Sequence, residues 1–303
     1  METKLKFRPI HFNWVAIHPQ PIGIIHFIGG AFFGTFPTIF YRYIIRRLFA
    51  QGYTIAALPF RFTFRHWIVA ISLVRDQKEL REAITTEAKR LGYEYKIYQQ
   101  KPISENPNHF WLAHSVGCKY IALLELLTEL EEQDIQEFLG ECVGSQQAVD
   151  IERSLRGVDF QDISLKNQPS VLLAPVIAGI ERAIPVVAVA ELVKKLGLDV
   201  QPNVKETRCL INKSHLFGLT AAITFGADKI ASNPEIDVDG EPKGTIQWLQ
   251  KHVASIKFSE LPRREHPAPL GFRFGDSQLA DEVIKLLKME TQQLESISTQ
   301  PEP

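Results

Sequence analysis

Short apolar runs and longer amphipathic segments alternate along the first 130 residues. The apolar runs are rich in β-branched and aromatic residues, which predicts buried strands at 23–28, 53–59 and 110–112. The other segments place apolar residues at helical spacing, which predicts helices at 38–50, 67–91 and 118–130. One or two further strands are expected within 7–15. Successive strands joined by helices imply a parallel sheet with right-handed crossovers.

The same alternation continues in the second half of the chain. Strands are predicted at 170–175, 220–225 and 254–258, and helices at 184–196, 206–213, 245–252 and 276–289. We therefore expect an α/β fold with a single domain over residues 1–295, followed by a disordered polar tail at 296–303. Two stretches depart from the alternation: 131–168 is a candidate insertion, helical or flexible, and 176–214 is a candidate cap over the sheet.

The composition is that of an ordinary globular protein. Of the 303 residues, 45% are hydrophobic and 23% are charged, and 34 Lys and Arg against 35 Asp and Glu give a net charge of −1. This balance argues against a nucleic acid partner, whose phosphates require clustered positive charge. No run of about 18 apolar residues predicts a transmembrane helix, which leaves peripheral membrane contact open. No signal peptide is expected, because no long apolar core follows the charged N-terminus.

The three cysteines, Cys118, Cys142 and Cys209, are few and widely spaced. This pattern predicts neither a disulfide framework nor a cysteine-rich metal site. We interpret all three as reduced thiols, which predicts a cytoplasmic location. Neither a metal nor a cofactor is expected.

The stretch Ala113-His-Ser-Val-Gly117 lies between the strand predicted at 110–112 and the helix predicted at 118–130. A serine on a strand-to-helix turn, with small residues two positions before and after it, has the pattern of a nucleophile elbow. The turn brings Ala113 and Gly117 so close together that larger side chains would clash. The pentapeptide alone is also compatible with an ordinary helix N-cap serine. Its position directly after an apolar strand favours Ser115 as a nucleophile.

A serine nucleophile requires a histidine base, and the histidine requires a carboxylate that orients it. In one of the known chain orders the acid and then the histidine follow the serine. His266 lies in a proline-rich loop after the last predicted strand, whereas His215 precedes a strand and His252 ends a helix. We therefore predict His266 as the base, with a surface histidine in a turn as the alternative interpretation.

Asp228 is the candidate acid because it lies just beyond the buried strand predicted at 220–225. A turn residue or a helix N-cap is the alternative interpretation for an aspartate in this position. Asp237 and Asp239, in the acidic loop that follows, are the other candidates.

The glycine-rich stretch 29–34 follows the strand predicted at 23–28, so it should reach the same edge of the sheet as Ser115. Backbone N–H groups at that edge can stabilise the negative charge that develops on a substrate oxygen. We predict Val116 as one donor and Ala31 or Phe32 as the other. A dinucleotide-binding loop is the alternative, but the spacing lacks the G-x-G-x-x-G pattern.

Aromatic residues are concentrated in the loops at 29–36 and 60–67. Core packing is the plain interpretation, and an apolar pocket for an acyl chain or leaving group is the functional one. Phe33, Phe60 and Phe62 are the candidates for the wall of this pocket. His114 is a further candidate; it has no second ligand at a useful spacing, which favours packing over metal binding.

Taken together, these stretches resemble the α/β-hydrolase superfamily and, within it, the family named domain of unknown function 1350, found mainly in cyanobacteria and plastid-bearing organisms. The resemblance covers most of residues 7–290 and is strongest at 25–34, 58–67, 113–119, 206–211 with 225–228, and 266–271. It implies an α/β-hydrolase fold and a triad of Ser115, Asp228 and His266, but no established substrate. The family usually has glycine at the position of Ala113 and a second aspartate at that of Ala227, so Asp228 is the one carboxylate of that pair.

These observations predict a serine hydrolase that cleaves a small-molecule ester or thioester, with an apolar or lipidic acyl group, through an acyl-serine. One alternative is a non-catalytic binding or assembly protein of the same fold, peripheral to a membrane or not. The other is an acyltransferase, or a lyase without a cofactor, that uses the same pocket with water excluded. The sequence does not indicate an oligomeric state.

Overall fold

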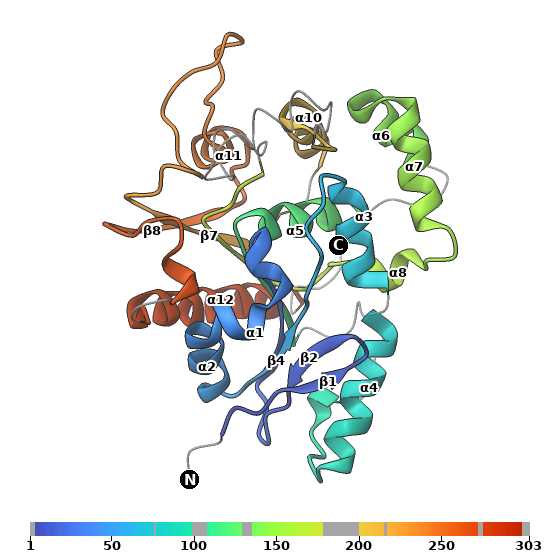
Figure 1. Cartoon of the computed structure of the whole chain (residues 1–303), viewed down its shortest axis with the longest axis vertical. Coiled ribbons are helices and arrows are strands. Elements are labelled where there is room, and N and C mark those ends of the chain that lie inside the picture. Colours follow the sequence, from blue (N-terminus) through green and yellow to red (C-terminus); the bar gives the residue numbers. More distant parts are fainter. Residues whose placement is uncertain are drawn as a thin grey trace.

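An eight-stranded sheet forms the centre of the protein (Figure 1). The computed structural model describes residues 4–75, 77–98, 108–128, 135–177, 200–214, 217–271 and 275–298. The strands are β1 (Arg8–Ile10), β2 (Asn13–Ala16), β3 (Gly23–Ile28), β4 (Tyr53–Ala57), β5 (His109–His114), β6 (Ser170–Leu173), β7 (Thr220–Phe225) and β8 (Lys257–Leu261), in the order β1-β2-β4-β3-β5-β6-β7-β8. From β4 to β8 all neighbours are parallel, and the β1–β2 hairpin joins β4 antiparallel. The predicted mostly parallel sheet is confirmed.

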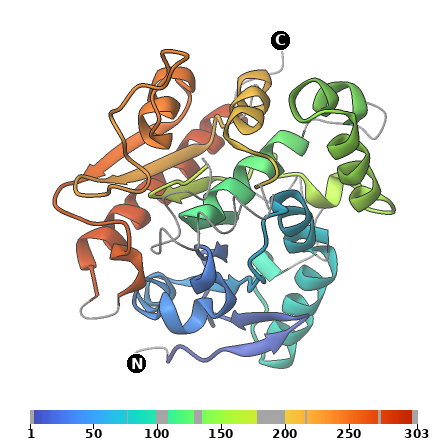
Figure 2. The same ribbon diagram turned by 45° about the horizontal axis from the view of Figure 1, so that its top comes forward.

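Helices cover both faces of this sheet. On one face α2 (Arg42–Ala50) packs against α12 (Ser277–Ser298), over an apolar cluster that includes Ile25 and Phe27 of β3. On the other face α5 (Val116–Leu127) lies against β5 and β6 and is covered by α3 (His66–Arg75) (Figure 2). Because both faces are covered, β3, β4, β5 and β7 are buried at every position.

The remaining described helices are shorter or peripheral. They are η1 (Phe32–Thr35), α1 (Pro37–Phe40), α4 (Gln77–Arg90), η2 (Lys96–Tyr98), α6 (Ile135–Val143), α7 (Ser145–Leu155), α8 (Phe160–Ile163), α10 (Val204–Lys213), α11 (Thr245–His252) and η6 (Ala268–Leu270). None of the helices in the described ranges is long and apolar enough to cross a membrane.

Several predicted boundaries differ from the structure. The helix predicted at 38–50 is interrupted at Tyr41, and the one predicted at 67–91 forms two elements, α3 and α4. The break between α3 and α4 does not interrupt the apolar spacing in the sequence. Both helices need an apolar face, because α3 packs on α5 and α4 packs on β1. The strand predicted at 254–258 begins at Lys257, where a partly exposed edge strand carries a weak apolar signal.

The described part of the candidate insertion contains three helices. Within 131–168 the chain forms α6, α7 and α8, and α6 and α7 pack together at one side of the molecule (Figure 1). In the candidate cap at 176–214, residues 178–199 lie outside the described residues, and with them the helix predicted at 184–196. The described part holds α10, which contacts α5 and α6. At the C-terminus α12 continues to Ser298, so the predicted tail starts too early; 299–303 lie outside the described residues.

Cys142 of α6 and Cys209 of α10 form a disulfide. The interpretation of all three cysteines as reduced thiols is therefore wrong for these two, and it holds for Cys118, which is free and buried. The error arose because the two partners are 67 residues apart, which no local pattern reveals. The cytoplasmic location inferred from reduced thiols loses that argument and stays a prediction.

Among the described residues five histidines are buried, and four of them, His26, His66, His109 and His114, are almost completely buried. His26 Nε2 and His109 Nδ1, on neighbouring strands, lie 2.8 Å apart; His66 begins α3, and His114 ends β5. Burial lowers the pKa of each well below its usual value. Glu125 of α5 shows the opposite effect, since burial raises its pKa to about 7 against two hydroxyl hydrogen bonds that lower it.

Removal of the disulfide should destabilise the protein. A Cys142→Ser, Cys209→Ser variant loses the crosslink that restricts the unfolded chain, and we expect the free energy of unfolding to fall by about 2–4 kcal/mol. Urea denaturation under non-reducing conditions measures this difference. A Cys118→Ser variant is the control, and equal stability of the double variant and the wild type would contradict the pairing.

Stability should decline as pH falls below about 6.5, because the unfolded state then binds protons that the buried histidines with lowered pKa values do not bind in the native state. The loss reaches at most about 1.4 kcal/mol per pH unit for each histidine. Glu125 acts in the opposite sense, since its raised pKa lets the native state bind a proton between about 4.5 and 7. The midpoint of urea unfolding between pH 7.5 and 5.5 checks the net sign, and an increase on acidification would contradict the expectation.

Candidate active site

Ser115 lies on the sharp turn between β5 and α5. Its backbone has φ 57° and ψ −121°, a region that non-glycine residues rarely occupy. Two hydrogen bonds to the chain around β6 hold this conformation: Ser115 N–H donates to Leu173 O at 3.0 Å, and Val176 N–H donates to Ser115 O at 3.1 Å. The end of β6 and the residues just after it therefore hold the strained turn through both the N–H and the C=O of Ser115.

Two glycines permit the close packing around this turn. A Cβ atom on Gly117 would lie 2.5 Å from Gly29 O and 2.8 Å from Ile28 O, so the first turn of α5 lies directly against the end of β3. A Cβ atom on Gly30 would lie 3.0 Å from Ser115 Cβ. The glycine-rich loop therefore passes beside the serine, as expected for loops at the carboxyl ends of neighbouring parallel strands.

A continuous set of hydrogen bonds joins Ser115, His266 and Asp228. His266 Nε2 lies 2.8 Å from Ser115 Oγ, and His266 Nδ1 lies 2.8 Å from Asp228 Oδ2. The loop after β8 brings in the histidine and the loop after β7 the aspartate, although 151 residues separate the histidine from the serine. The structure thus brings together the three side chains that the sequence singled out.

The surroundings of Asp228 set the direction of these bonds. Asp228 Oδ1 accepts N–H groups from Ile230 at 2.7 Å and Ala231 at 3.0 Å, and its side chain is fully buried. This environment suits an ionised carboxylate, which only accepts hydrogen bonds. His266 Nδ1 therefore donates to Asp228, which leaves Nε2 without a proton and able to accept one from Ser115 Oγ.

The predicted backbone donors lie next to this set. Val116 is the first residue of α5, and Ala31 precedes η1. Within the described part of the chain, neither of these two N–H groups nor that of Phe32 has an acceptor. Gly30 N–H, by contrast, donates to Tyr41 Oη at 2.7 Å. Val116 together with Ala31 or Phe32 remains the predicted donor pair.

A second hydrogen-bonded chain lies behind the serine. Tyr41 Oη lies 2.9 Å from His114 Nδ1, and His114 Nε2 lies 3.0 Å from His266 O. Sequence reasoning missed Tyr41, because it falls inside a segment with regular helical spacing. His114 is 1% exposed and both of its ring nitrogens are bonded, so its predicted place in the wall of a substrate pocket is wrong.

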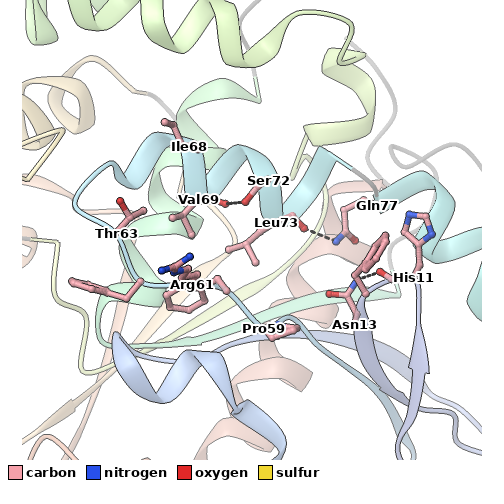
Figure 3. Close-up of a pocket in the computed structure, with 13 residues that line it drawn as sticks. His11, Asn13, Pro59, Arg61, Thr63, Ile68, Val69, Ser72, Leu73 and Gln77 are labelled. Carbon is pink, nitrogen blue, oxygen red and sulfur yellow. Dashed lines mark hydrogen bonds between the residues drawn. The ribbon is translucent and has the colours of Figure 1, made fainter.

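A pocket of about 650 Å³ lies beside the glycine-rich loop (Figure 3). The β1–β2 turn, the loop after β4 and α3 form its walls, which include Phe60 and Phe62 but not Ser115. Phe62 also contacts Phe32, with ring centroids 4.9 Å apart, which links this pocket to the glycine-rich loop. Phe33 packs instead on Phe40, on the α2 side of the sheet, and is not among the residues that line this pocket.

The other candidates lie elsewhere. His252 Nε2 contacts Glu241 Oε2 at 2.7 Å and its ring stacks on Trp248. Asp237 pairs with Arg208, and Asp239 with Lys205. His215 lies outside the described residues. In the part of the chain that is described, no cluster of His, Cys, Asp and Glu could hold a metal ion.

The family described as "Protein of unknown function (DUF1350)" matches residues 6–138. This range contains the glycine-rich loop, the loop after β4 and the elbow, so the resemblance to that family is confirmed there. The passages at 206–211, 225–228 and 266–271 lie beyond the matched residues. No curated protein matches the chain in sequence.

Solved esterase structures share the fold over almost the whole chain. Esterase B from Lactobacillus rhamnosis, in a structure with a tributyrin phosphonate inhibitor, is 13% identical with a TM-score of 0.53, and the match covers 98% of this chain and 86% of that chain. A protein from Lactobacillus plantarum, assigned as a carboxylesterase, is 11% identical with a TM-score of 0.50, over 95% of this chain and 99% of that chain. At such identities the likeness shows the fold, and this chain has the α/β-hydrolase fold.

Proposed function

We propose that the protein is a serine hydrolase that cleaves an ester or thioester through an acyl-serine intermediate, with Ser115, His266 and Asp228 as nucleophile, base and acid. The observation that carries this proposal is the continuous hydrogen bonding from Asp228 through His266 to Ser115 Oγ. The esterase activity of structural neighbours such as esterase B is consistent with it.

In the acylation step Ser115 Oγ attacks the carbonyl carbon of the substrate while its proton passes to His266 Nε2. The carbonyl π-electron pair moves to the oxygen, and N–H groups of Val116 and of Ala31 or Phe32 stabilise that charge. The positive charge on His266 is balanced by Asp228 through Nδ1–H. The bond to the leaving alcohol or thiol then breaks, and His266 Nε2 returns the proton to it.

Deacylation repeats these steps with water. His266 Nε2 takes a proton from water, the resulting hydroxide oxygen attacks the acyl carbon, and the bond to Ser115 Oγ breaks. The proton returns to Ser115 Oγ, and the carboxylic acid leaves. An acyltransferase would differ only in the acceptor that replaces water.

The aromatic surface near the site supports an apolar acyl group or leaving group. Phe60 and Phe62 line the pocket beside the glycine-rich loop, and Phe32 is 54% exposed where it contacts Phe62. Phe36 and Ile39, which follow Phe32 in the chain, are also exposed, at 56% and 66%. Such side chains suit a lipidic substrate, whether it is dissolved or presented at a membrane surface.

One observation favours the non-catalytic alternative. Ser115 is only 6% exposed, and the side chain of His266 is 11% exposed. A binding or assembly protein of this fold does not require a substrate to reach the serine. The direct test is therefore whether a serine-directed reagent reacts.

We expect the wild-type protein to react covalently with a fluorophosphonate probe at Ser115, because His266 activates the hydroxyl. Ser115→Ala should abolish labelling, and Asp228→Asn should slow it by about 10³–10⁴-fold through the wrong histidine tautomer. In-gel fluorescence, with mass spectrometry of the labelled peptide, measures both.

Matched variants away from the site control for general effects of substitution. Ser154→Ala removes a hydroxyl from α7, and His252→Ala removes a histidine from the end of α11; both should label like the wild type. Circular dichroism establishes that each variant is folded. A folded wild type that does not react, while a control hydrolase does, would favour the binding protein.

The pocket predicts a dependence on substrate chain length. Phe62→Ala removes a ring from the pocket and from the contact with Phe32. We therefore expect kcat/KM for long-chain p-nitrophenyl esters to fall about tenfold, which corresponds to the loss of the binding energy of about two buried methylenes. The acetate ester should change less than twofold. Ile236→Ala, an exposed apolar residue in the acidic loop, is the control, and an equal loss for all chain lengths would contradict this placement of the acyl group.

A further inference from the structure

We propose that Tyr41 and His114 are positioning residues, which hold the glycine-rich loop and the base loop in fixed register with Ser115. This inference rests on the proposed function and adds two residues to it. Neither residue would touch the substrate, since both are at most 1% exposed. They form the series Gly30 N–H, Tyr41 Oη, His114 ring and His266 O, with heavy-atom separations of 2.7, 2.9 and 3.0 Å.

The chemistry of the two ends determines the direction of every bond in this series. His266 O is a carbonyl oxygen and only accepts, so His114 Nε2 must carry a proton. In a neutral imidazole Nδ1 is then bare and accepts the proton of Tyr41 Oη–H. Tyr41 Oη keeps its lone pairs for Gly30 N–H, which only donates. All three bonds are satisfied by one arrangement of protons.

This arrangement persists because neither side chain ionises readily. Burial lowers the pKa of His114 well below its usual value, and the nearby His266 lowers it further. Burial also raises the pKa of Tyr41 above its usual value. In a charged His114 Nδ1 would carry a proton too, which would leave Tyr41 Oη–H without its acceptor. Tyr41 and His114 therefore stay neutral, and every hydrogen bond in the series is donated in the direction from Gly30 to His266.

The fold places Tyr41 where it can reach both loops. The residue lies at the break between α1 and α2, with φ −106° and ψ 19°, and its ring packs edge-on against Phe27 of β3 at 4.8 Å. A Cβ atom on Gly29 would lie 2.8 Å from the ring edge of Tyr41. The glycine-rich loop thus lies directly on this ring, which supports the peptide just before the predicted donors.

The other end of the series holds the base. Asp228 orients the His266 side chain, whereas His114 holds the His266 backbone, and the two imidazole rings lie 5.0 Å apart. Because His114 immediately precedes Ser115, one residue links the positions of nucleophile, base and oxyanion loop. Catalysis by prearranged groups is sensitive to displacements of about 1 Å between such parts.

Three variants separate the two halves of the series. Tyr41→Phe removes both bonds of the hydroxyl. His114→Gln keeps an N–H donor near the place of Nε2 but loses the acceptor for Tyr41. His114→Asn keeps an oxygen acceptor near the place of Nδ1 but loses the donor to His266 O.

For Tyr41→Phe we expect kcat for a p-nitrophenyl ester to fall at least tenfold, with KM within about twofold of the wild type, because the loss affects transition-state alignment. His114→Gln should show a loss no larger than that of Tyr41→Phe, because it breaks only one of the two bonds of the Tyr41 hydroxyl. The double variant Tyr41→Phe, His114→Gln should be no worse than Tyr41→Phe alone, since the bond that His114→Gln breaks is already lost in Tyr41→Phe. His114→Asn combined with Tyr41→Phe should be worse than either alone, because different bonds are lost.

Tyr53→Phe is the matched control. It removes a hydroxyl from a buried tyrosine of β4 and should leave kcat unchanged. Thermal unfolding establishes that all variants are folded at the assay temperature. Folded Tyr41→Phe with wild-type kcat, or multiplicative losses in Tyr41→Phe, His114→Gln, would overturn the proposal.

The series can also be tested without any substrate. In ¹⁵N NMR spectra of the wild type, His114 should show a protonated Nε2 and a bare Nδ1 that do not titrate between about pH 5.5 and 8.5. The opposite tautomer, or a titrating His114, would overturn the proposal. Failure of the proposed function has a different signature, because the wild type would then not react with fluorophosphonate while the NMR result could still hold.

Discussion

The approach of α5 to the backbone of β3 is the constraint on which the rest of the site depends. Gly117 lies so close to Gly29 O that a Cβ atom would be 2.5 Å away, which is closer than any side chain allows. This contact brings the first turn of the helix beside the glycine-rich loop. It places Ser115 between the two, with Val116 N–H on one side and the peptide of Gly30 on the other. A larger residue at 117 would separate the serine from both predicted sources of oxyanion donors.

The strained backbone of Ser115 persists because its surroundings over-determine it. Its N–H donates to Leu173 O of β6, and its C=O accepts from Val176 N–H just after that strand. Helix α5 behind it is buried along its whole length, including Lys119 and Glu125. Burial of such polar residues is unfavourable unless they are bonded, and Glu125 accepts hydrogen bonds from Ser170 and Thr220 on β6 and β7. The helix that carries the elbow is therefore held to the sheet by polar contacts as well as by apolar packing.

The parts of the site that follow from sheet geometry could be predicted from the sequence, and the parts that depend on long-range packing could not. Parallel strands bring their carboxyl ends to one edge, so a serine, an aspartate and a histidine placed after β5, β7 and β8 were expected to meet there. The role of Tyr41 could not be predicted, because the helical spacing around it gives no sign of the break between α1 and α2 that turns its ring toward β3. The disulfide between Cys142 and Cys209 joins α6 and α10, whose contact follows from packing that no local pattern specifies. His114 was a candidate for the wall of the substrate pocket, whereas β5 is buried at every position and both ring nitrogens of His114 are bonded in the interior.

Hydrogen bonds with backbone groups hold the reactive residues of this site in place. The residues that set reactivity are therefore different from the residues that would select the substrate. Two backbone N–H groups hold Asp228, and a hydrogen bond from His114 Nε2–H to His266 O holds the main chain of His266. The backbone of Ser115 is held by Leu173 at the end of β6. The exposed rings of Phe32 and Phe36 and the partly exposed ring of Phe62 lie outside the segments that these bonds join. Substitutions in the aromatic loops can therefore alter which acyl group binds without disturbing the alignment of the serine, the histidine and the aspartate. Substitutions that disturb the alignment are expected instead at Gly30, Tyr41 and His114, which are buried behind the reacting groups and contribute nothing to the surface that a substrate would contact.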